Sequence, residues 1–158
     1  MRRGVMVWLV LGTIAVSEGG AQEVRPPQSM PVTLADFRSL SWLVGRWRGG
    51  PSPVFYEQYR FRDDSTIAMT AYTDSTFATA TADSSMIEWR QGQVRTRTAR
   101  STYDAIEVAP GRIRFRRTGA PDGGHRFERV SADEWIATLF PRGAGTDTVV
   151  YRMRRLSP

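Results

Sequence analysis

Cysteine and lysine are both missing from this chain of 158 residues. Without cysteine, disulfide bonds, thiolate metal sites, cysteine nucleophiles and lipid attachment at a cysteine are excluded. The chain has a single histidine, His125, which excludes most catalytic triads and metal sites built on several histidines. A glycine-rich phosphate loop and an HExxH motif are also missing. The common sequence signatures of enzymes are therefore few, and we predict no metal site.

Positive charge comes entirely from arginine, and the formal net charge of the chain is +6. Such a balance is compatible with nucleic acid or an anionic surface as a partner. The arginines, however, are scattered between Asp and Glu residues, and only Arg112, Arg114, Arg116 and Arg117 lie close together. Apolar residues alternate with the first three of these, which indicates the solvated face of a strand. We therefore predict no nucleic-acid partner.

Residues 1–21 have the organisation of a secretory signal. Arg2 and Arg3 form the positive start, a short apolar stretch follows, and small residues ending at Ala21 provide a cleavage site. The apolar stretch is too short to cross a bilayer as a helix, which argues against a retained anchor. The paired arginines are compatible with twin-arginine export, but the residues after them favour ordinary secretion. We predict a secreted or periplasmic protein that does not span a membrane after cleavage.

The remaining chain divides into a linker and one domain. Residues 22–32 are rich in proline and have no periodicity, as in a flexible linker. Residues 33–158 are long enough for a single domain. The domain begins with a short helix, because Thr33 can cap it with Asp36 at the third helical position. The apolar residues of this helix are Leu34, Phe37, Leu40 and Leu43, which slope along one face.

After Gly45 the helical period ends and short alternating runs follow, separated by turn residues. The predicted strands are 54–62, 66–73, 76–82, 85–90, 93–100, 102–108, 112–118, 125–130, 134–140 and 148–156. The connections are too short for helical crossovers, so neighbouring strands should pair antiparallel. Closure removes the exposed edges that an open sheet would leave. We predict an all-β fold, a single antiparallel up-and-down barrel of about 8–10 strands, with room inside for one small ligand.

The segment LSWLVGRWRG, residues 40–49, and the aromatic strand FYEQYRF, residues 55–61, resemble the entry of the calycin superfamily. Within it, the chain is similar to small bacterial lipocalin-like domains of unknown function, and more distantly to nitrobindin-like and fatty-acid-binding barrels. The resemblance covers residues 34–156 in outline. It implies that Gly45 and Trp47 help to close the barrel, with Trp47 packed under an arginine of the last strand, either Arg152 or Arg154.

Nitrobindins bind haem iron through a histidine near the C-terminal end. Here His125 follows a turn and lies well before the last strand, so the resemblance does not carry the haem ligand over. Tyr151 or Met153 is a possible axial ligand by residue type alone. We predict no cofactor, with haem as the alternative.

Strand phase predicts which side chains point into the barrel. The expected ligand-binding set is Phe55, Glu57, Tyr59, Phe61, Met69, Met86, Phe115, Phe127, Trp135 and Tyr151. Its apolar majority predicts a small hydrophobic or amphipathic molecule, such as a lipid, as the partner, with Glu57 as a polar contact.

Two other functions remain open. Glu57 and Glu88 are both in phase with inward residues, and two carboxylates in an apolar interior can perform acid–base catalysis in a hydrolase or isomerase. We favour the simpler expectation that each carboxylate pairs with an arginine or turns outward. The third possibility is a barrel with a solid core that serves as an interaction module.

Overall fold

The computed structural model describes residues 31–120, 122–141, 143 and 147–157. The predicted signal, residues 1–21, and most of the predicted linker lie outside the described residues. The end of that linker is held to the barrel, because the backbone N–H of Val32 donates to the carbonyl of Gly92. The indole N–H of Trp89 in turn donates to the carbonyl of Val32 at 2.7 Å.

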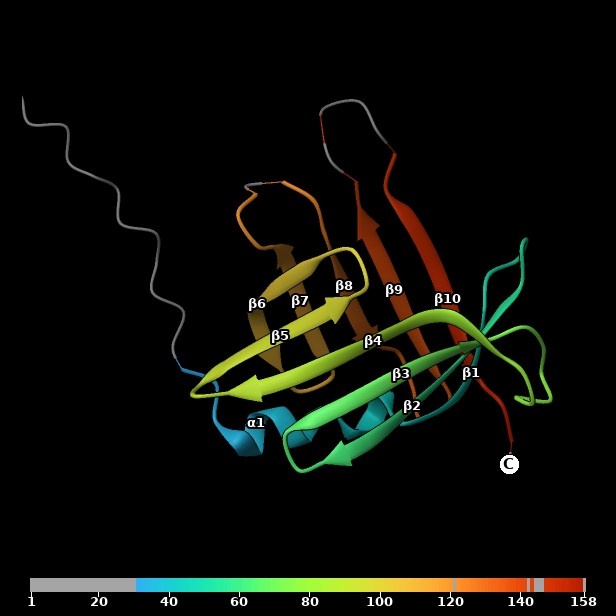
Figure 1. Cartoon of the computed structure of the whole chain (residues 1–158), viewed down its shortest axis with the longest axis horizontal. Helices are drawn as coiled ribbons and strands as arrows, with labels where there is room; N and C mark the ends of the chain where they lie inside the picture. The colour runs from blue at the N-terminus through green and yellow to red at the C-terminus, as the bar shows by residue number, and fades with distance from the viewer. Residues whose placement is uncertain (1–30, 121, 142, 144–146, 158) are drawn as a thin grey trace, which may run out of the picture.

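Ten antiparallel strands form one closed barrel, which confirms the predicted fold class (Figure 1). They are β1 (Gly45–Gly49), β2 (Phe55–Asp63), β3 (Thr66–Tyr72), β4 (Ala80–Arg90), β5 (Gln93–Thr98), β6 (Thr102–Ala109), β7 (Arg112–Arg117), β8 (Gly124–Arg129), β9 (Glu134–Phe140) and β10 (Val149–Arg155). Each strand pairs with the next along the chain, and β1 pairs with β10 to complete the cylinder. No strand of the barrel therefore has an unpaired edge.

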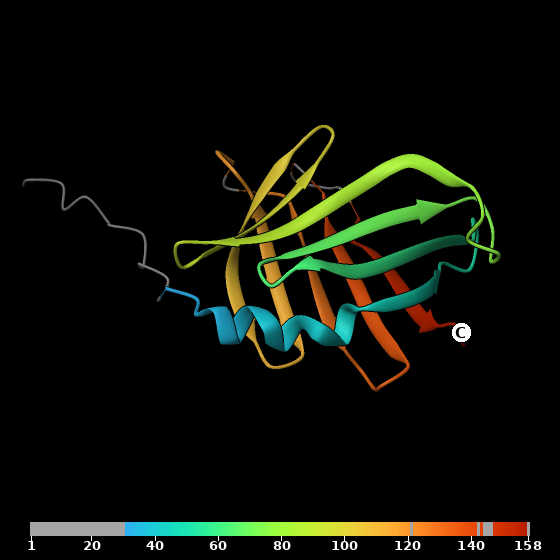
Figure 2. The ribbon, with the colours of Figure 1, turned by 60° about the horizontal axis from the view of Figure 1, so that its bottom comes forward.

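One pair of predicted strands was wrong. Residues 76–82 and 85–90 were expected as two strands with a turn at Asp83-Ser84, but Ala80–Arg90 is one continuous strand that bends as it crosses the barrel (Figure 2). The chain reverses earlier, in the β3–β4 loop, where Phe77 adopts a positive φ of 56°. Neither position 83 nor position 84 is a glycine or proline, the residues that most strongly favour a turn. Ser84 instead pairs with Thr70 of β3.

The predicted helix forms and covers one end of the barrel (Figure 2). It consists of α1 (Leu34–Arg38) and a 3-10 turn, η1 (Ser39–Leu43). Thr33 and Asp36 form the expected capping box. The apolar face carries Phe37, Leu40 and Leu43, each with 0% of its surface exposed. No helix in the described part of the chain is long and apolar enough to cross a membrane.

The end of the barrel next to the helix, which we call the base, is packed solid. Inward side chains from five of the strands fill it, and all are almost completely buried: Trp47, Ile67, Ile87, Val94 and Ile113. The outward residues of β7 are the arginines, whose solvated position was predicted correctly from the alternation. The helix face and these side chains together form the buried core of the base.

The arginine that stacks on Trp47 is Arg155, and the prediction of Arg152 or Arg154 was wrong. The guanidinium carbon of Arg155 lies 4.2 Å from the Trp47 ring centroid. Arg152 and Arg154 point outward, where both contact the carboxylate of Glu134. Strand phase accounts for this, since position 155 faces the same side as the inward residues 151 and 153.

Arg155 also donates hydrogen bonds to three backbone carbonyl groups. Its guanidinium donates to the carbonyls of Val44 at 2.9 Å, Ala132 at 3.0 Å and Trp42 at 3.4 Å. Gly45 permits this approach, because a Cβ at that position would collide with the Arg155 guanidinium. Gly45 also has a φ of 142°, which side-chain-bearing residues rarely adopt. The Gly-x-Trp motif and Arg155 therefore form one closing contact between the ends of the domain.

Replacing Arg155 with Met should destabilise the protein by about 2–4 kcal/mol, because hydrogen bonds from a charged group and a cation–π contact are lost together. Arg154→Met is the matched control on the outer face, and it should change stability by less than about 0.5 kcal/mol. Urea denaturation followed by tryptophan fluorescence measures both. Equal effects of the two substitutions would contradict the closing role of Arg155.

Candidate functional site

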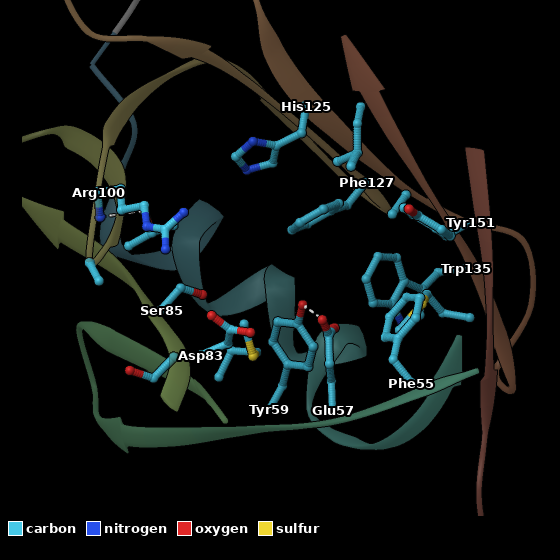
Figure 3. A pocket seen from close by; sticks show the side chains of 17 residues that line it. Phe55, Glu57, Tyr59, Asp83, Ser85, Arg100, His125, Phe127, Trp135 and Tyr151 are labelled. Carbon is cyan, nitrogen blue, oxygen red and sulfur yellow. Dashed lines mark hydrogen bonds between the residues drawn. The ribbon is translucent and has the colours of Figure 1, made fainter. Parts of the chain in front are cut away.

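Above the packed base, the barrel contains a cavity with a volume of about 540 Å³ (Figure 3). One side of the cavity, which we call the inner wall, is formed by residues of β2, β8, β9 and β10. The opposite side is formed by residues of β3, β4 and β5. The buried rings of Tyr59 and Trp135 line its lower part, with centroids 5.8 Å apart. Trp135 contacts Trp47 of the base on its other side, with ring centroids 5.9 Å apart. Trp135 thus lies between the cavity and the packed base.

Most of the side chains predicted to bind a ligand do line this cavity. They are Phe55, Glu57, Tyr59, Met69, Phe127, Trp135 and Tyr151. Met153, considered for its residue type alone, lines it as well. Strand alternation placed these residues correctly on the inner face, and whether they contact a ligand stays a prediction.

Phe61 and Phe115 do not line the cavity, although their phase is inward. Phe61 lies beyond the base, where its ring packs edge-on against Phe37 of α1 at 6.3 Å and stays 37% exposed. Phe115 is 1% exposed and packs behind the rings of His125 and Phe127. Alternation gives the face of a strand on which a residue lies, but it does not give the height along the barrel.

Met86 and Glu88 face outward, so their predicted inward position was wrong. The inward residues of β4 are instead Ser85 in the cavity wall and Ile87 in the base. Ile87 and Trp89 have more apolar surface to bury than Met86 and Glu88, which decides the phase of the strand. Glu88 forms ion pairs with Arg90 at 3.2 Å and Arg97 at 3.8 Å. It therefore cannot act with Glu57 inside the barrel.

Sequence reasoning missed the polar side of the cavity. Asp83, Ser84, Thr98, Ala99 and Arg100 line it from the bend of β4 and the end of β5, and all five are exposed, so they form its mouth. The expected turn hid Asp83 and Ser84, since a turn would have removed these two residues from the wall. His125 was also missed, although it alternates with Phe127 in the same strand and shares its inward phase.

Glu57 is the carboxylate of the inner wall. Its Oε2 accepts a hydrogen bond of 2.9 Å from the hydroxyl of Tyr59, as the dashed line in Figure 3 shows. Loss of hydration in these apolar surroundings raises the pKa of Glu57 to about 6, against the smaller lowering effect of the Tyr59 hydrogen bond. Among the described residues no cation pairs with it, so the expected arginine partner does not lie beside Glu57.

His125 lies on the cavity wall between aromatic rings. Its ring centroid is 4.7 Å from Phe115, 4.9 Å from Tyr103 and 5.0 Å from Phe127. Burial lowers the pKa of His125 to about 4, so its ring is neutral at physiological pH. No group of three His, Asp or Glu side chains converges as metal ligands within the described ranges.

Comparison with known proteins adds no functional assignment. No protein-family model matches the sequence, and no curated protein matches it significantly. The closed barrel is compatible with the calycin-like fold that residues 40–49 suggest, and functional inference rests on the cavity itself.

The raised pKa of Glu57 has a consequence for stability. Ionisation of this carboxylate disfavours the folded state. The free energy of unfolding is therefore highest below pH 4.5, where Glu57 is neutral, and part of it is lost as the pH rises through about 6. Glu57→Gln lacks this loss. The free energy of unfolding of Glu57→Gln minus that of the wild type should therefore rise by about 2 kcal/mol between pH 4 and pH 7.5.

Urea denaturation of both proteins at half-unit pH steps measures this difference. His125 has the opposite dependence, because a lowered pKa makes the folded state lose stability as the pH falls from 6.5 toward 4. That contribution is present in both proteins and cancels in the difference. A difference that stays constant with pH would contradict the apolar surroundings of Glu57.

Proposed function

We propose that this is an exported binding protein that holds one small hydrophobic or amphipathic molecule inside its barrel. The observation that carries the proposal is the cavity of about 540 Å³ above a packed base. Ligand pockets are typically about 300–1,000 Å³, mostly apolar, with a few polar groups that orient the ligand. The apolar wall, with Glu57, His125 and the polar mouth, has this composition.

Export is proposed from the leader of residues 1–21, and membership of the calycin superfamily from the closing contact and the barrel together. The Gly45, Trp47 and Arg155 arrangement matches what the resemblance implies, once the arginine is corrected to position 155. A catalytic function is less well supported. Glu88 lies outside, and the other carboxylate of the cavity, Asp83, is exposed at the mouth, so Glu57 has no second inner carboxylate among the described residues.

A paired substitution in β4 tests the binding function. Ser85 faces the cavity and the adjacent Met86 faces outward, so the indole of Ser85→Trp should occupy part of the cavity while Met86→Trp leaves it open. We expect Ser85→Trp to weaken binding of a fluorescent naphthalene sulfonate probe by at least about tenfold, which corresponds to 1.4 kcal/mol. The Met86→Trp protein should bind like the wild type.

Native mass spectrometry of the exported wild-type protein complements this titration. It should give a polypeptide that starts at Gln22 and carries one small molecule. Failure of the wild type to bind the probe or to carry any molecule, or equal loss of probe binding in both variants, would contradict binding inside the barrel.

His125 favours haem binding as a second candidate. Its ring borders the cavity and is neutral at pH 7. It has no hydrogen-bonding partner among the described residues, so a ring nitrogen is free to bind iron. Arg100 at the mouth suits an acidic substituent of the macrocycle. Bound haem would supply redox and gas-binding chemistry, with His125 holding the iron. Tyr151 and Met153 border the same cavity.

Absorbance spectroscopy tests this candidate. If it is correct, haem added to the protein should give a sharp, red-shifted Soret band, and His125→Gln should lose that band. The Glu88→Gln protein is the control, because that side chain lies outside the barrel. An unchanged spectrum in His125→Gln would eliminate His125 as the ligand.

A further inference from the structure

We propose that the cavity selects a hydrophobic amine, held with its ammonium group against the carboxylate of Glu57 and the aromatic rings around it. This inference rests on the proposed binding function and names the class of ligand. Three features of the cavity support it: a carboxylate without a cation, rings on several sides, and an apolar remainder.

The carboxylate of Glu57 is incompletely paired. Oε2 accepts the Tyr59 hydroxyl, whereas Oε1 has no donor among the described residues. A carboxylate can accept about four hydrogen bonds, so most of the acceptor positions of Glu57 are available to a ligand in the cavity. With a pKa of about 6, Glu57 is mainly ionised at pH 7.5. A charge buried in an apolar site is costly unless a counter-charge and hydrogen bonds compensate it. A ligand with an ammonium group supplies both.

Aromatic rings border the cavity on the same side as Glu57. Phe55 and Tyr59 flank it in β2, and Tyr151 packs edge-on against Phe55 with centroids 5.1 Å apart. Trp135 and Phe127 continue this wall, with centroids 4.9 Å apart. Ring faces attract cations, and rings combined with a carboxylate are the usual protein environment of an ammonium group. Figure 3 shows Glu57 between the rings of Tyr59, Phe55 and Trp135.

The rest of the cavity suits a hydrocarbon chain. Met69, Ala137, Leu139 and Met153 line it without presenting a charge. Arg100 is the single arginine in the wall formed by described residues, and it lies at the exposed mouth. A fatty acid that entered head-first would place its carboxylate near that of Glu57. To avoid this repulsion, the fatty acid would have to bind in the opposite direction, with its carboxylate at the mouth beside Arg100.

Calorimetric titration with three ten-carbon ligands distinguishes these cases: decylamine, 1-decanol and decanoic acid, at pH 7.5. We expect decylamine to bind the wild type at least about tenfold more tightly than decanol, as expected for a buried charge pair, and decanoic acid to bind most weakly. The net charge of +6 attracts the acid and repels the amine, so long-range attraction cannot produce this order.

Two substitutions with the same change in charge locate the selectivity. Glu57→Gln should abolish the preference for decylamine over decanol, and Glu88→Gln on the outer face should keep it. If decanol and decanoic acid bind but decylamine has no advantage, or Glu57→Gln keeps the advantage, the amine inference is wrong and the binding function stands. If none of the three ligands binds, both proposals are overturned.

A pH series on the wild type tests the same point without a variant. The amine stays charged between pH 7.5 and pH 5, while Glu57 takes up a proton as the pH falls through about 6. The other titratable or charged groups that line the cavity are Tyr59, Asp83, Arg100, His125 and Tyr151. The affinity for decylamine should fall several-fold over this range relative to that for decanol. An unchanged ratio would overturn the amine inference.

Discussion

The contact between Arg155 and Trp47 is the interaction on which the closed barrel depends. It joins the last strand to the first, where β1 and β10 share a short ladder. The same guanidinium holds the carbonyls of Trp42 and Val44, at the point where the helix leads into β1, and that of Ala132 before β9. One side chain thus connects the helix, the first strand and the last two strands. Gly45 is required because a side chain there would displace that guanidinium.

Closure at this end allows space at the other. Phe37, Leu40 and Leu43 bring the helix face against the base, and the inward residues of the strands fill what remains. The buried apolar surface that stabilises the fold is therefore concentrated in one half of the barrel. The other half can leave a cavity open, with Trp135 at the boundary between them. The packed core and the cavity are divided along the barrel axis, because strand residues alternate between faces while their height along the axis decides their neighbours.

Glu57 is the residue at which folding and the proposed binding function oppose each other. An ionised carboxylate in an apolar wall lowers the stability of the empty protein, and Tyr59 compensates only part of it. Polar groups that weaken a fold in this way are often the ones that orient a ligand. His125 has the same character, being kept neutral by burial beside the same cavity. The two groups respond to pH in opposite directions, which moderates the combined dependence of stability on pH.

The sequence by itself determined the all-β class, the closed antiparallel barrel, the capped helix and most of the cavity-lining side chains, because these follow from local periodicity and turn chemistry. It did not determine which face of β4 points inward. The odd-numbered and even-numbered side chains of this strand are alternatives for the inner face, and burial of Ile87 and Trp89 selects the odd-numbered set. The expectations that Arg152 or Arg154 reaches Trp47, that Phe61 lines the cavity, and that Glu57 pairs with an arginine or turns outward were wrong. Tertiary structure decided these points, because they depend on distances between strands far apart in the chain.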